Sequence, residues 1–208
     1  MQIRIFQLGS LGTNCYLVWD EPSKEALIID PADYTESVRS AITDENLHLK
    51  YVILTHGHGD HVGGVHAILA DFPEAKLAAG KDELPILADP AYSYTEYING
   101  RTETFDPDIL LSDGEELFIG TIPLKTIATP GHTIGGISIL ADGAVFAGDT
   151  LFRTSIGRTD LPTGDYQTLE KSIREKLYTL PDDTPVYPGH MEPTTIGYEK
   201  RYNGIVRE

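Results

Sequence analysis

The chain has 208 residues, of which 32 are acidic and 16 are basic, so its formal net charge at pH 7 is −16. This length suits one globular domain with a substantial core, and an apolar fraction of 40% requires no large disordered region. The negative charge repels nucleic acid and anionic membrane surfaces, which excludes both as expected partners and favours a small-molecule substrate.

The beginning of the chain, residues 1–6, has the pattern of a β-strand and lacks the long apolar stretch of a signal peptide or a membrane span. We therefore expect a cytoplasmic protein. Cys15 is the only cysteine, which excludes an intrachain disulfide and a thiolate metal cluster. Any bound metal must be held by nitrogen and oxygen atoms, and the oligomeric state stays open.

Short apolar runs separated by turns predict antiparallel strands in the first third of the chain, at 3–6, 16–19 and 26–29. The amphipathic segment 34–46 predicts a helix, and the apolar run 51–54 predicts a buried strand.

Beyond residue 64, apolar side chains recur at helical spacing until Phe72-Pro73, which predicts a second helix, and a short strand follows at 76–79. The segment 81–107 carries aromatic residues with little periodicity, which is typical of a helical insertion or of a lid over a cleft. The rest of the chain predicts a helix at 166–177. It also predicts five strands, at 116–119, 124–128, 136–140, 144–147 and 185–187.

Strands in both halves of the chain, with helices between them, favour an α+β fold. We expect a four-layer αβ/βα sandwich, in which two sheets pack face to face and helices cover them outside. One domain, 1–208, is expected, without a separate C-terminal helical domain.

Three histidines and one aspartate fall within six residues, directly after the strand predicted at 51–54: His56, His58, Asp60 and His61. In an extended segment the first three point the same way, and the intervening glycines let the chain curl so that His61 converges on them. Given the seven histidines and seventeen aspartates of this chain, such a string arises by chance on the order of once in a thousand chains. The pattern therefore indicates a metal site rather than a polar turn.

Three further candidate ligands each follow a predicted strand, where active sites gather: His132, Asp149 and His190. Each is a weak signal alone, because a glycine followed by histidine or aspartate usually marks a turn. Together with the string they make five histidines and two aspartates, enough for two adjacent metal ions with Asp149 between them. Imidazole and carboxylate favour two Zn²⁺, with iron or manganese as alternatives, and so dense a set with open positions for water indicates catalysis.

The string 55–61, joined to His132, Asp149 and His190, resembles the metallo-β-lactamase superfamily, and the likeness spans nearly the whole chain. Segments 151–152, 155–162 and 189–197 look like signatures of its small glyoxalase II-like branch. The resemblance implies one metal held by His56, His58 and His132, a second held by Asp60, His61 and His190, and Asp149 between them. It also implies the αβ/βα sandwich and three supporting residues near the site: Asp30, Arg158 and Asp160.

The resemblance implies hydrolysis of thioesters such as S-lactoylglutathione. Two metals would lower the pKa of a shared water toward about 7, and Asp60 would both ligate and orient the resulting hydroxide. Glyoxalase II proper carries an additional C-terminal helical region that holds glutathione, whereas this chain ends eighteen residues after His190. Lys200, Arg201 and Arg207 are interpreted as part of a surface tail, so thioester hydrolysis is expected while glutathione specificity is left open.

Three alternatives remain at this point. An iron-dependent persulfide dioxygenase would use a single iron held by two histidines and an aspartate. A lactonase or ester hydrolase would use the same metal centre with a different pocket, and a metal-binding module would bind metal without catalysis. The two other histidines are assigned no ligand role, because His48 is expected in a helix-to-strand connection and His66 on the helix after the string.

Overall fold

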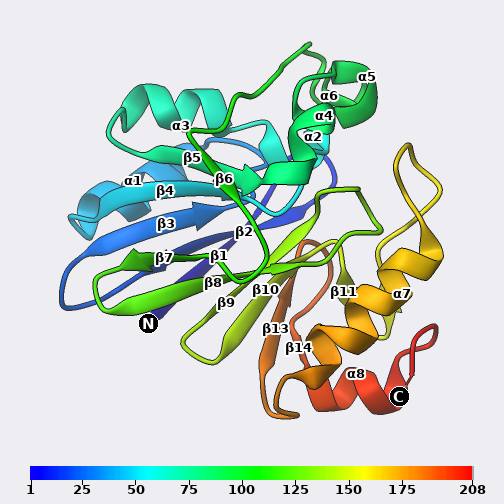
Figure 1. Ribbon diagram of the computed structural model, residues 1–208. Helices are drawn as coiled ribbons and strands as arrows, with labels where there is room; N and C mark the ends of the chain where they lie inside the picture. Colours follow the sequence, from blue (N-terminus) through cyan, green and yellow to red (C-terminus); the bar gives the residue numbers. More distant parts are fainter. Residues whose placement is uncertain (208) are drawn as a thin grey trace.

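The computed structural model describes residues 1–207 and contains two mixed six-stranded sheets and a two-stranded hairpin (Figure 1). The strands of the first sheet are hydrogen-bonded in chain order: β1 (Gln2–Leu8), β2 (Thr13–Trp19), β3 (Glu25–Ile29), β4 (His48–Leu54), β5 (Lys76–Gly80) and β6 (Ile109–Leu111). The second sheet has the order β14 (Thr194–Thr195), β13 (Pro185–Pro188), β10 (Ala144–Gly148), β9 (Ile137–Ala141), β8 (Ile122–Ala128) and β7 (Glu116–Ile119).

The alternation of side chains along each inner strand fills two separate cores. In β3, Leu27 and Ile29 join the core between the two sheets, whereas Ala26 and Ile28 join the core under the outer helices of the first sheet. Successive side chains of a strand point to opposite faces, so a continuous apolar run serves both. This explains why β3 is apolar from Ala26 to Ile29 and β4 is apolar from Val52 to Leu54.

Helices cover the outer face of each sheet. α1 (Glu36–Asp44) and α3 (Val65–Asp71) pack on the first sheet, and α7 (Tyr166–Glu175) and α8 (Ile196–Tyr202) pack on the second. A 3₁₀ turn, η2 (Leu177–Thr179), contributes to the core beneath α7 and α8. The predicted α+β four-layer sandwich is confirmed. No helix within residues 1–207 is long and apolar enough to cross a membrane.

The segment 81–107 forms a helical insertion, which is one of its two predicted forms. It contains η1 (Lys81–Glu83), α4 (Leu84–Leu87), α5 (Pro90–Ser93) and α6 (Thr95–Asn99). Figure 1 places these short helices beside α2 (Gly59–Val62), at one end of the sandwich. Tyr94 joins α5 to α6 in a left-handed conformation, with φ of 57°, and this turns the chain sharply between the two helices.

Several short elements escaped prediction. Arg201 and Arg207 are exposed, as the interpretation of a surface tail implies, but the segment that carries Lys200 and Arg201 is a packed helix rather than a tail. β6, β14 and the hairpin of β11 (Leu151–Phe152) and β12 (Ser155–Ile156) lie in stretches with no strand prediction. Residues 196–202 form α8, and Ile196 and Val206 are fully buried in the core beneath α7. His48 is the exposed first residue of β4 rather than part of a connection.

Glu199 joins α8 to the turn of the β11–β12 hairpin. Its fully buried carboxylate accepts hydrogen bonds from the Thr154 backbone N–H at 2.8 Å, the Thr194 hydroxyl at 2.6 Å and the Asn203 side-chain amide at 2.8 Å. The C-terminal helix therefore fixes a hairpin that belongs to another part of the chain.

We expect Glu199→Ala to lower the free energy of unfolding by about 1–3 kcal/mol or more, because it leaves several buried donors unsatisfied. Urea unfolding measures the loss. Glu192→Ala is the control, since that exposed carboxylate makes only a surface ion pair with Arg153 and is worth about 1 kcal/mol or less. Equal losses in the two variants would contradict the anchoring role.

Candidate metal centre

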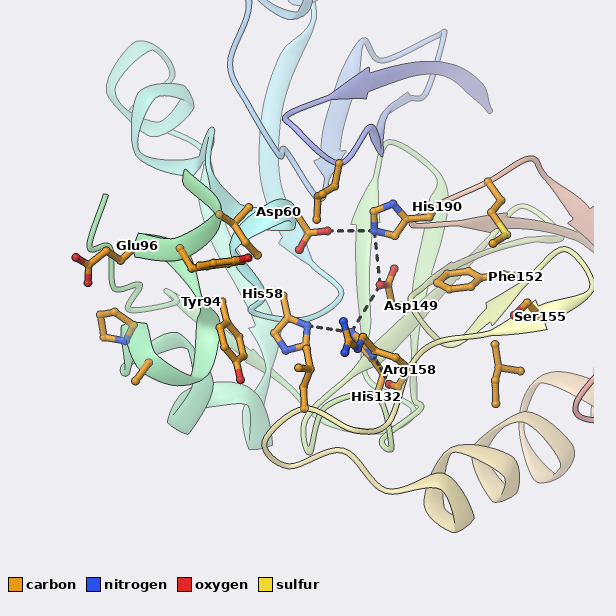
Figure 2. Close-up of a pocket in the computed structure, with 18 residues that line it drawn as sticks. His58, Asp60, Tyr94, Glu96, His132, Asp149, Phe152, Ser155, Arg158 and His190 are labelled. Atoms are coloured by element: carbon orange, nitrogen blue, oxygen red, sulfur yellow. Dashed lines mark hydrogen bonds and ion pairs between the residues drawn. The ribbon is translucent and has the colours of Figure 1, made fainter. Parts of the chain in front are cut away.

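All seven predicted ligands converge at one end of the two sheets. His56 and His58 follow β4, His132 follows β8, Asp149 follows β10 and His190 follows β13. The remaining two, Asp60 and His61, lie on α2. Figure 2 shows His58, Asp60, His132, Asp149 and His190 turned toward one another across this end of the fold.

Three imidazoles form the first group of candidate ligands. The Nε2 atom of His132 lies 2.9 Å from Nδ1 of His58 and 3.2 Å from Nε2 of His56. All three side chains are buried, and their ligand-type atoms lie within 4.8 Å of one another. Three convergent nitrogens at this spacing suit zinc or a similar transition metal.

The second group contains Asp60, His61 and His190. The Oδ2 atom of Asp60 lies 3.1 Å from Nε2 of His190 and 3.6 Å from Nε2 of His61. His61 is fully buried and Asp60 nearly so, whereas His190 is partly exposed toward the cleft. Two imidazoles and one carboxylate again form a set of transition-metal ligands.

Asp149 faces both groups. Its Oδ2 atom lies 3.6 Å from Nε2 of His132 in the first group and 3.7 Å from Nε2 of His190 in the second. Its Oδ1 atom lies 3.4 Å from Nε2 of His61. A carboxylate in this position can contact two adjacent cations at once.

The expected path of the chain through the string was wrong in one respect. His58 is extended, with φ of −68° and ψ of 147°, but a helix begins at Gly59, so Asp60 and His61 lie on the first turn of α2. The helical rotation directs these two neighbours to different partners, Asp60 toward His190 and His61 toward Asp30 and Asp149. Convergence therefore comes from a strand-to-helix transition rather than from a curled loop.

Buried groups orient the candidate ligands. Asp30, predicted as a supporting residue, accepts hydrogen bonds from the Thr55 backbone N–H and hydroxyl, and its Oδ2 atom lies 2.9 Å from Nδ1 of His61. His132 Nδ1 lies 2.8 Å from the backbone carbonyl oxygen of Arg158 and donates to it. A hydrogen bond to one ring nitrogen fixes the tautomer and leaves the other nitrogen free to bind metal.

The other two predicted supporting residues lie outside the cluster. The guanidinium of Arg158 forms a two-point ion pair with Asp160, at 2.7 and 2.8 Å, and both side chains are exposed. Arg158 lines the cleft and its carbonyl oxygen contacts His132, whereas Asp160 pairs with Arg158 and is not among the residues that line the cleft. The structure therefore brings Asp30 and Arg158 to the site but not Asp160.

The pKa values of His56 and His58 in the first group shift in the opposite direction to that of His61 in the second. Burial and neighbouring histidines lower the pKa of His58 to about 3, and they hold the pKa of His56 well below its usual range. These imidazoles are neutral and keep their lone pairs. Burial alone would lower the pKa of His61 as well, but Asp60, Asp149 and Asp30 outweigh it and raise this pKa to about 10. The carboxylates around His61 thus favour a positive charge at this point.

Unpartnered polar atoms also indicate that the site fits cations. Within residues 1–207, five buried side-chain nitrogen or oxygen atoms have no hydrogen-bond partner, and three of them belong to His58, His61 and Asp149. Buried polar groups are nearly always satisfied, so a concentration of exceptions requires a cause. The chemistry of this donor set fits metal cations, which would accept lone pairs and offset the carboxylate charge.

The cluster forms the floor of a cleft of about 1030 Å³. One wall comes from the insertion, with Tyr94, Tyr97 and Ile98, and another comes from the β11–β12 hairpin, with Phe152 and Ile156. The sequence indicates a lid over a cleft as one of two forms of 81–107, and it shows 151–152 and 155–162 as family signatures without placing them in a cleft wall. The walls are mainly apolar and the floor is polar, which is the usual character of a small-molecule site.

The family follows from comparison with known proteins. A family model described as the metallo-beta-lactamase superfamily matches residues 8–190. The chain belongs to the metallo-β-lactamase superfamily. This confirms the resemblance inferred from the histidine string, and it makes the protein a member of a superfamily of metal-dependent hydrolases with a candidate metal site.

Individual members of the superfamily match over nearly their full length. Hydroxyacylglutathione hydrolase GloC of Haemophilus influenzae is 36% identical, over 98% of this chain and 97% of its own. The crystal structure of the BLEG-1 B3 metallo-β-lactamase is 37% identical, with a TM-score of 0.89 and coverage of 97% of this chain and 98% of that one. TTHA1623, in a di-iron-bound form, is 31% identical, with a TM-score of 0.83 and coverage of 96% and 98%.

Proposed function

We propose that this protein is a hydrolase that binds two metal ions, preferably Zn²⁺, and cleaves hydroxyacyl thioesters. One observation carries the proposal: Asp149 lies within 3.4–3.7 Å of ligand-type nitrogens of both groups, at the floor of a large cleft. A carboxylate between two sets of ligands is the arrangement that two adjacent metals require. Iron or manganese would fit the same nitrogen and oxygen ligands.

The ligand assignment follows the two groups. His56, His58 and His132 would hold one ion, Asp60, His61 and His190 the other, and Asp149 would contact both. Bound there, the metals would supply Lewis acidity to the substrate carbonyl and would lower the pKa of water toward about 7.

The side chains around the metals have separate tasks. Asp60 would orient the attacking water by accepting its hydrogen bond, because its carboxylate lies at the cleft floor beside His190. The apolar walls would bind the acyl or thiol part of the substrate and exclude bulk water. Arg158 would offer a positive charge on the cleft wall to an anionic substrate group.

The thioester assignment is supported by GloC, which is named as a hydroxyacylglutathione hydrolase. That relative aligns over 97% of its own length, so a protein of this size carries the name without an additional C-terminal region. The short C-terminus therefore does not argue against a glutathione thioester. A small-molecule substrate and a cytoplasmic location are part of the proposal.

The test combines metal analysis with two thioesters. We expect the purified protein to contain about two zinc ions per chain and to hydrolyse both S-lactoylglutathione and an acyl thioester that lacks glutathione. Removal of metal by a chelator should abolish hydrolysis, and Zn²⁺ should restore it, because the metals would supply both the Lewis acid and the acidified water.

Three results would contradict the proposal, each in a different way. One iron per chain with oxygen uptake would replace the proposal with a dioxygenase. Hydrolysis of lactones or simple esters but of neither thioester would leave the metal centre and change the substrate class. Metal binding without activity on any ester, thioester or lactone would indicate a binding module.

A further inference from the structure

Glu83 is a fully buried carboxylate outside the set of candidate ligands. It is the last residue of η1, and no cationic side chain of residues 1–207 pairs with it. Its Oε1 atom accepts a hydrogen bond from the Gly57 backbone N–H at 2.8 Å. Its Oε2 atom accepts from the Gly135 backbone N–H and from the Thr133 hydroxyl, both at 2.9 Å.

The three donors belong to the two loops that carry the first group of candidate ligands. Gly57 lies between His56 and His58, and Thr133 directly follows His132. One carboxylate therefore ties together the two loops that supply all three imidazoles of this group. None of its hydrogen bonds involves α2 or the loop of His190.

Both loops also approach the insertion too closely for side chains. A Cβ atom on Gly135 would lie 2.0 Å from the backbone nitrogen of Glu83, and one on Gly57 would lie 2.9 Å from Cδ2 of Leu87. The loops are thus pressed onto η1 and α4, with the carboxylate enclosed between them. Small shifts of Glu83 would be transmitted directly to the backbones that hold the imidazoles.

A buried carboxylate without a cation is costly unless it is fully hydrogen-bonded. Burial raises the pKa of Glu83 to about 7, and its three hydrogen bonds oppose this rise. An ordinary core position would be cheaper to fill with an apolar residue. The hydrogen bonds of Glu83 point to a role at the two loops that it joins.

We propose that Glu83 is a positioning residue that sets the separation of the two loops holding the first metal site, and so controls occupancy of that site alone. The metal role of the loops rests on the proposed function. Asp30 differs from Glu83, because it contacts His61 of the second group directly and reaches His56 of the first group through Thr55.

The experiment measures Zn²⁺ affinity by calorimetric titration in two backgrounds. His190→Ala leaves the first group complete, and His132→Ala leaves the second group complete. We expect Glu83→Gln to weaken Zn²⁺ binding by about 10- to 100-fold in the first background and to leave it unchanged in the second. Asp30→Asn should weaken binding in both backgrounds, because Asp30 contacts His61 and reaches His56 through Thr55.

Two further variants separate positioning from general loss of structure. Thr133→Val removes one of the three donors, is nearly isosteric, and should weaken the same site in the same direction by a smaller factor. Glu199→Gln is the matched control, since Glu199 is equally buried and accepts hydrogen bonds from three residues, none of which lies in the loops of His56, His58 and His132. It should lower the urea midpoint without changing either Zn²⁺ affinity.

The outcomes distinguish this inference from the proposed function. Equal weakening of both sites by Glu83→Gln, or weakening of neither, would overturn the positioning role while thioester hydrolysis could still stand. Selective weakening in a protein that cleaves no thioester would support the positioning role and reject the substrate. A wild-type protein that binds no Zn²⁺ would overturn both.

Discussion

Asp149→Ala should remove metal and hydrolytic activity together. The carboxylate contacts both groups of candidate ligands, with Oδ1 3.4 Å from His61 and Oδ2 3.6 Å from His132. It also supplies one of the negative charges that offset two cations. Losing a residue that only orients a ligand already costs about 10- to 100-fold in metal affinity or activity, so we expect kcat/KM to fall more than about 100-fold.

Elemental analysis after dialysis, beside thioester hydrolysis, measures this loss. Asp142→Ala is the control, because Asp142 is an exposed carboxylate paired with the N-terminal amine and lies outside the cleft. It should retain both metals and full activity. Normal hydrolysis by a purified Asp149→Ala protein would refute the ligand assignment.

The sequence predicted those parts of the site in which a residue of metal-ligand type directly follows a recognisable apolar strand. The string from His56 to His61 follows a strand whose apolar run is visible without any structure. His132, Asp149 and His190 each follow such a strand, so their meeting could be inferred from the rule that sheet ends gather active sites. The family resemblance then assigned each residue to one of two groups, which the distances support.

The missed elements are short or depend on distant contacts. β11, β12 and β14 have two residues each, too few for a period to be recognised. α8 was hidden because three of its seven residues are charged and consecutive, Glu199 to Arg201, although Ile196 and Glu199 are fully buried. Its stability comes from packing on the second sheet, which no local pattern records.

Glu83 illustrates the same limit at the site itself. In the run Lys81-Asp82-Glu83 it has the pattern of a solvent-exposed helix start, and nothing nearby in the chain satisfies its carboxylate. Its donors are Gly57, Thr133 and Gly135, which are 26 to 52 residues away. Only the folded chain brings them together, so a buried carboxylate of this kind carries no sequence signal.

Gly189 was interpreted only as a turn residue, and the structure gives it a stricter role. A Cβ atom there would lie 2.2 Å from Oδ1 of Asp149 and 2.7 Å from Cε1 of His61. Two hydrogen bonds hold the Gly189 backbone in place. Its N–H donates to the Gly148 carbonyl at 2.8 Å, and its carbonyl accepts from the Asn14 backbone N–H at 2.7 Å. An added methyl group must therefore displace the carboxylate that faces both metal groups.

We expect Gly189→Ala to weaken metal binding and to lower kcat/KM by at least about 10-fold without removing any ligand. Gly143→Ala is the contrasting control: a Cβ at that turn meets open space, but its φ of 77° is strained for alanine. It should cost about 1–2 kcal/mol of stability and leave metal content unchanged. Zinc titration and urea unfolding together separate a loss of zinc affinity from a loss of stability. The loss expected for Gly189→Ala comes from contact with the Asp149 carboxylate and not from backbone strain. A Gly189→Ala protein with wild-type zinc affinity would therefore show that this carboxylate does not need its observed position.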